Sequence, residues 1–163
     1  IIVLAFISVI GVFVTAQWLY VFGLAQSNLQ RDVTVIAEAI IIRNPVKEQI
    51  GVYGLRSASS FTIPVTNPVG SEINFIGTDG NTRKYFVSGN SIIYQSPTGS
   101  PAERTVYTAP ANTSITLLFS PVSQGGFTDN ETVGVYIALA QNLSGKTVSG
   151  SVSTHVNIRN IQK

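Results

Sequence analysis

The side chains that most often carry out catalysis are few in this chain and are scattered along it. Histidine occurs once, as His155, inside an alternating stretch that predicts a β-strand. Cysteine is absent, so disulfides, thiolate metal sites and cysteine nucleophiles are excluded within the sequence. Catalysis requires a nucleophile or acid–base group with partners that converge on it. We therefore expect no enzyme, no catalytic residue and no cofactor.

The eight carboxylates are dispersed in the same way. Asp129 and Glu131 lie close together, but a calcium ion takes about 6–8 oxygen ligands, and most of those are missing here. Asp79 precedes Gly80, and an Asp-Gly pair favours a tight hairpin turn, which explains this aspartate without a metal. The sequence predicts no metal site.

Three tripeptides match the Asn-X-Ser/Thr acceptor sequence for N-glycosylation. They begin at Asn112, Asn130 and Asn142. All three fall in loops or near the ends of predicted strands, where a glycan has room. These asparagines are the candidate modification sites.

The charge balance excludes nucleic acid as an expected partner. Ten basic and eight acidic residues give a net charge of +2, and the basic residues are not clustered. Charged residues make up 11% of the chain, against about 25% in an average soluble domain. Ser, Thr, Asn and Gly fill the polar positions instead, as suits an extracellular or glycan-covered surface.

Residues 1–30 contain no charged side chain, and the first charge is Arg31. About 20 apolar residues in a helix cross a membrane. A secretory signal peptide would carry a basic segment before its apolar part, and no Met occurs anywhere in the sequence. We expect a leader that is cut just before Ile1. The alternative is that the sequence begins inside a longer chain.

Small residues recur along one face of this apolar helix. They are Ala5, Ser8, Gly11 and Thr15, spaced three or four apart. Small residues let helices approach closely in an apolar surrounding, and Gln17 could find an amide partner across such an interface. This face is the expected site of helix–helix assembly, although a single-pass anchor also tolerates a few such residues.

The helical period continues beyond the length that a membrane needs. A second apolar stripe consists of Leu29, Val33, Ile36 and Ile40. We assign this stripe to the same assembly interface. Asn44-Pro45 disfavours helical geometry, so the helix is expected to end near Arg43. Residues 1–44 are thus predicted to form one long hydrophobic helix.

From Pro45 onward the apolar residues alternate with a period of two, which indicates strands. Nine strands are predicted: 49–55, 61–66, 72–76, 83–88, 91–95, 104–108, 114–119, 132–140 and 146–158. Short strands at this spacing suggest an antiparallel, Ig-like β-sandwich. The fold class is therefore α+β, with a head domain at residues 45–163. We expect residues 46–163 to fold alone as a β-rich monomer.

The uncharged start, the apolar run and its amphipathic continuation resemble the type IV pilin superfamily over about the first 44 residues. Bacterial members usually begin with Phe and carry Glu at the fifth position, whereas this chain has Ile1 and Ala5. It is more similar to the archaeal branch, the archaeal type IV pilins and archaellins, which normally lack that Glu. The resemblance implies a leader peptidase and pilus assembly machinery as partners.

The expected function is that of a structural subunit of an extracellular helical filament, like a type IV pilus used for surface attachment. The subunit would be a membrane-inserted precursor before assembly and a homo-oligomer afterwards. Two alternatives remain. One is an archaellin, which serves motility, and the other is a single-pass membrane protein with an extracellular β-sandwich binding domain.

Overall fold

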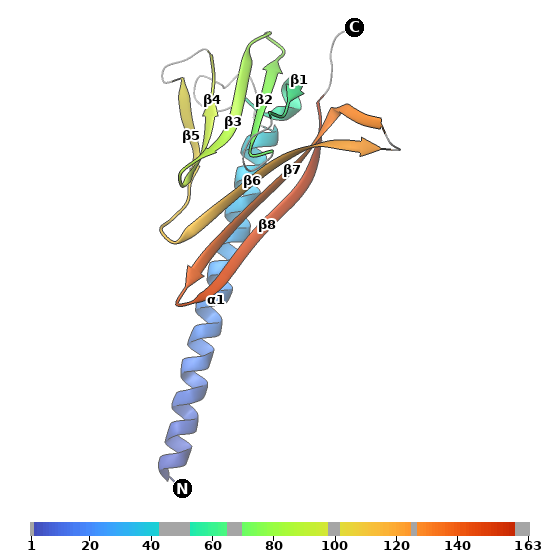
Figure 1. Ribbon diagram of the computed structural model, residues 1–163. Helices are drawn as coiled ribbons and strands as arrows, with labels where there is room; N and C mark the ends of the chain where they lie inside the picture. Colours follow the sequence, from blue (N-terminus) through green and yellow to red (C-terminus); the bar gives the residue numbers. More distant parts are fainter. Residues whose placement is uncertain (1, 43–52, 65–69, 98–101, 125–126, 159–163) are drawn as a thin grey trace.

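One long helix is followed by two antiparallel β-sheets (Figure 1). The computed structural model describes residues 2–42, 53–64, 70–97, 102–124 and 127–158, with side chains from Ser8 onward except at 123–130. The helices are α1 (Ile2–Ile42) and the short 3-10 helix η2 (Leu55–Ser57). The strands are β1 (Ala58–Thr62), β2 (Glu72–Gly77), β3 (Thr82–Ser88), β4 (Ser91–Gln95), β5 (Glu103–Thr108), β6 (Thr113–Gln124), β7 (Phe127–Leu143) and β8 (Lys146–Asn157).

Helix α1 confirms the predicted long N-terminal helix. It runs without interruption for 41 residues, which at about 1.5 Å per residue makes it roughly 60 Å long. Gly11 and Gly23 lie inside it and do not break it. The helix is described up to Ile42, which agrees with the expected end near Arg43, ahead of the Asn44-Pro45 pair.

The strand predictions from β2 to β8 are confirmed, with β6 and β7 longer than expected. Two earlier predictions differ. The strand expected at 61–66 is β1, at Ala58–Thr62. Leu55, at the end of the strand expected at 49–55, lies in η2, and residues 49–52 lie outside the described part.

The head consists of two consecutive meanders. The five-stranded sheet has the order β1-β2-β3-β4-β5, and the three-stranded sheet has the order β6-β7-β8. All neighbours are antiparallel. An Ig-like sandwich instead alternates strands between its two sheets. The antiparallel sheets are therefore confirmed, whereas the Ig-like identity is not.

A single hydrophobic core joins the second half of α1 to both sheets. In Figure 1 the long strands β6–β8 run diagonally along the helix, and the five-stranded sheet lies around its upper end. From the helix, the core includes Leu29, Val33, Ile36, Ala37, Ala39 and Ile40. The boundary expected at residue 44 thus separates helix from strands in the sequence, but the core extends across it.

Aromatic rings form a ladder on the inner face of the five-stranded sheet. The rings of Phe75 and Tyr85 stack with centroids 5.6 Å apart, and those of Tyr85 and Tyr94 are 5.2 Å apart. The ring centroids of Tyr53 and Phe75 are 6.1 Å apart. The carbonyl oxygen of Tyr53 accepts a 2.7 Å hydrogen bond from the Tyr85 hydroxyl. The fully buried guanidinium of Arg83 lies 4.3 Å over the Tyr53 ring.

Arg83 owes its burial to the Asp79-Gly80 turn. Its two terminal nitrogens donate to the two carboxylate oxygens of Asp79, at 2.8 and 2.6 Å. These bonds hold the pKa of Asp79 well below its usual range. The aspartate that the sequence assigned to a turn therefore also neutralises a buried cation.

We predict that Asp79 makes the head sensitive to acid. Its depressed pKa contributes stability that is fully present above the unfolded-state value of about 3.9 and is lost as the pH falls below it. Asp79→Asn should lower the free energy of unfolding at pH 7 by about 1–2 kcal/mol, because a charge-assisted pair is lost at a site where water screens part of the effect. Urea unfolding at pH 7 and pH 3 measures this. The variant should lose less stability between these two pH values than the wild type, and an equal loss would contradict the prediction.

Candidate membrane and assembly surface

The first half of α1 projects beyond most of the head, and its exposed side chains from Ser8 onward are mostly apolar (Figure 1). Exposure exceeds 60% for five large side chains: Val9, Val12, Phe13, Leu19 and Tyr20. The other large exposed apolar side chains up to residue 24 are Ile10, Val14, Trp18, Val21 and Leu24. By length and composition this helix could cross a membrane, and none of its most apolar part is buried by the head.

We call residues 2–24 of α1 the free segment. The predicted small-residue face lies in it. A side chain at Gly11 would meet no atom within 4 Å, so the face is open in the single chain. The Thr15 hydroxyl donates to the Gly11 carbonyl oxygen at 2.8 Å, so it needs no partner from another helix. Ser8 and Gln17 are exposed on the same segment, and the side chain of Ala5 lies outside the described part.

The second apolar stripe lies inside the head. Its four members are buried by the chain's own head, at 4, 0, 2 and 0% exposure: Leu29, Val33, Ile36 and Ile40. The periodicity correctly indicated a face to be covered. The prediction that a helix of a neighbouring subunit covers this face is wrong, because β7, β8 and η2 already cover this side of α1.

Polar contacts fix the helix against the head. The Gln30 amide donates to the Ser151 carbonyl oxygen at 3.2 Å. The Tyr107 hydroxyl donates to Asp32 at 3.1 Å. Burial, together with this bond, raises the pKa of Tyr107 to about 12. The two contacts link the second half of α1 to both sheets, and the free segment continues from this half as one uninterrupted helix.

Gly150 is a positioning residue that the sequence reading passed over. An added Cβ would lie 2.8 Å from the Gln30 backbone nitrogen and 2.9 Å from the Leu29 carbonyl carbon. Strand β8 therefore approaches the helix backbone as closely as only glycine allows. A glycine inside a predicted strand is a known sign of close backbone approach, so the signal was present.

We predict that Gly150→Ala loosens the helix from the sheet. Two backbones must move apart to accommodate the methyl group, and such overpacking costs about 1–3 kcal/mol. Urea unfolding of the chain in detergent measures the free energy of unfolding. Ser149→Ala, at the exposed neighbouring position, is the matched control and should change stability by less than about 0.5 kcal/mol. Equal stability of both variants would contradict the close approach.

Two of the three candidate glycosylation sites lie side by side. The Asn142 backbone nitrogen donates to the Asn112 carbonyl oxygen at 3.0 Å, and both side chains are exposed. They line a hollow of about 420 Å³ together with Asn90 and Thr147. The side-chain oxygen of Asn142 accepts a hydrogen bond from the Gly145 backbone nitrogen. The Asn142 side-chain nitrogen, which is the atom that a glycan would modify, is therefore left toward solvent. Asn130 lies in β7, and its side chain is outside the described part.

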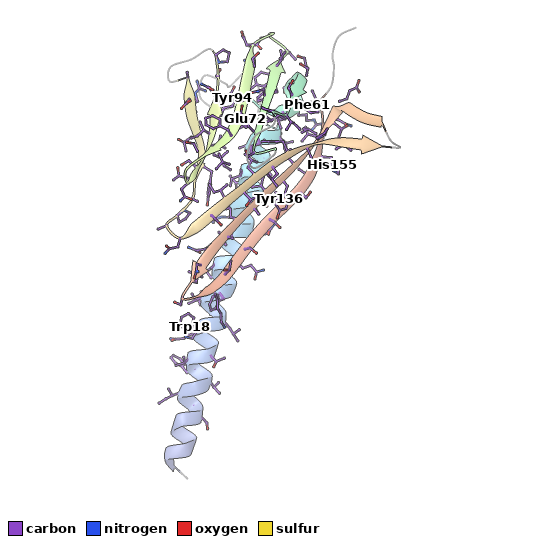
Figure 2. All side chains as sticks on the ribbon, viewed as in Figure 1. Trp18, Phe61, Glu72, Tyr94, Tyr136 and His155 are labelled. Atoms are coloured by element: carbon purple, nitrogen blue, oxygen red, sulfur yellow. The ribbon has the colours of Figure 1, made fainter. Side chains whose placement is uncertain are left out.

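No catalytic arrangement is found in the part of the chain that the structure describes. His155 is exposed on β8 (Figure 2). Among the described residues, no three His, Cys, Asp or Glu side chains group in a way that could hold a metal ion.

Comparison with known proteins gives no relative: no protein-family model, no curated protein and no solved structure matches this chain. The surface of α1 is therefore interpreted from its own geometry.

Proposed function

We propose that this chain is a structural subunit of an extracellular helical filament of the type IV pilus kind. The free segment of α1 would be held in the membrane before assembly and would pack with copies of itself in the filament core afterwards. The head would then form the outer surface. The observation that carries the proposal is the exposed, mostly apolar first half of a helix whose second half belongs to the head's core.

Burial energetics support this cycle between two apolar surroundings. Each large apolar side chain left in water costs about 1.5–3 kcal/mol, and ten of them are exposed between residues 8 and 24. Water is therefore excluded as the resting environment of this segment. Lipid and a bundle of identical helices both remove the cost.

The absence of a joint between the two halves of α1 favours a filament over a flexible anchor. A tethered binding domain works best when its head can reorient, whereas a helical assembly requires each head at a fixed angle to its core helix. Here the helix continues directly from the free segment into the core. Repetition of one such rigid unit by a rotation that does not close gives an open fibre.

Filaments sheared from the cells that make this protein test the proposal. An antibody raised against the head should label filaments along their whole length in negative-stain micrographs. Mass spectrometry of the same material should find peptides from both the helix and the head of this chain. Label confined to the membrane fraction, without filaments, would instead support a single-pass anchored head.

A further inference from the structure

The tip of the β7–β8 hairpin lies against α1 where the helix leaves the head (Figure 1). Ser144 and Gly145 both have positive φ, at 50° and 83°, as in the two-residue turn that suits a hairpin. Leu143 pairs with Lys146 across this turn. The turn is thus a fixed platform that presents Lys146 beside the helix.

A crevice separates this tip from the helix. Its volume is about 340 Å³, and it is lined by Thr15, Trp18, Leu19, Phe22, Ser144 and Lys146. The helix side is aromatic and aliphatic, with the Trp18 and Phe22 rings stacked 5.6 Å apart. The hairpin side offers a hydroxyl and an ammonium group. An occupant that fits both walls is amphipathic and carries negative charge.

The ammonium of Lys146 lies 5.6 Å over the Phe22 ring. Among the residues that the structure describes, no carboxylate lies within ion-pair distance of it. The first charged residue on α1 is Arg31, about 20 Å further along the helix than Trp18. Positive charge at the crevice therefore comes from Lys146.

The position of the crevice along the helix matches the depth of a membrane surface. Trp18, Tyr20 and Phe22 bring three aromatic side chains together at this level of α1, as in the aromatic belts that mark membrane surfaces. Trp18 lies on α1 just below the tip of the β7–β8 hairpin (Figure 2). With the helix inserted up to this point, Trp18 would lie at the level where lipid headgroups begin.

We propose that this crevice binds one anionic phospholipid while the subunit resides in the membrane. The lipid phosphate pairs with Lys146, and the upper acyl chain packs on Trp18 and Leu19. The site rests on the membrane-inserted state of the proposed function. One lysine at an anionic surface favours a negatively charged headgroup by about 1 kcal/mol, which is about fivefold.

Trp18 is the only tryptophan of the chain, so tryptophan fluorescence reports on this one position beside the crevice. The full chain is reconstituted in phosphatidylcholine vesicles, in which a small share of the lipid is brominated near the headgroup end of its chains. In one series the brominated lipid is phosphatidylcholine, and in the other it is phosphatidylglycerol. Bromine quenches Trp18 on contact, and the excess quenching by phosphatidylglycerol gives its enrichment at the site.

The wild type should enrich phosphatidylglycerol about fivefold. Lys146→Gln should remove this enrichment, and Lys146→Arg should retain it. Arg31→Gln is the matched control: it removes the same charge about two Debye lengths away at physiological salt, so enrichment should persist.

Three results would overturn the site. Equal quenching by both lipids in the wild type would show no headgroup preference, and enrichment that survives in Lys146→Gln would place the charge elsewhere. Loss of enrichment in inorganic phosphate, at matched ionic strength, would show that the crevice recognises free phosphate rather than a lipid. If neither lipid quenches Trp18, the helix is not inserted, and the membrane-inserted state itself fails together with the site.

Discussion

A chain that begins at residue 46 is expected to lose the folded head. It lacks four side chains that are at most 4% exposed: Leu29, Val33, Ile36 and Ile40. Burial of each is worth about 1.5–3 kcal/mol, and a whole domain is stable by only about 5–15 kcal/mol. Their removal also exposes the sheet side chains that share their core. This outcome reverses the expectation from the sequence that residues 46–163 fold alone.

The matched control begins at residue 25. It keeps the helical residues that belong to the core and removes the exposed apolar segment, so we expect a soluble, folded monomer. Far-ultraviolet circular dichroism, gel filtration and urea unfolding compare the two fragments. A cooperative, monomeric 46–163 fragment would show that the sheets close on each other without the helix.

The local structure of this chain was readable from its sequence because the signals are local. An uninterrupted apolar run followed by a 3.6-residue period predicts a helix, and Asn44-Pro45 predicts its end. Alternation and turn pairs such as Asp79-Gly80 predict the strands. These patterns depend on neighbours within a few residues, and the structure confirms them from β2 to β8.

The partners of each surface were not readable in the same way. Periodicity shows that the face containing Val33 must be covered, but a neighbouring helix and the chain's own sheet produce the same pattern. Residues far away in the sequence determine which partner covers the face: Gly150 lets the helix backbone approach β8, and the Tyr107 hydroxyl donates to Asp32. Strand order has the same difficulty, because two meanders and an Ig-like sandwich use similar short strands.

The largest effect on assembly is expected from Gly11→Leu. In the single chain a side chain at this position meets open space, so leucine fits without a clash. Leucine also favours the helix by about 1 kcal/mol over glycine, and it is well accepted at the centre of a membrane helix. Folding and membrane insertion of the variant should therefore match the wild type or exceed it. Any loss must arise between subunits.

In a bundle of identical helices the added side chain would push neighbours apart, at about 1–3 kcal/mol per site, and the cost recurs in every subunit. We expect wild-type amounts of the variant in the membrane and about a tenfold or larger fall in filament yield, counted in sheared material by microscopy and immunoblot. The control is Ile10→Phe, which enlarges an exposed side chain that is neither three nor four residues from any member of the small-residue face, and it should assemble normally. Because the single chain offers Gly11 no contact at all, wild-type filament numbers from Gly11→Leu would show that this face is not an interface. The small residues would then serve only to pass through the membrane.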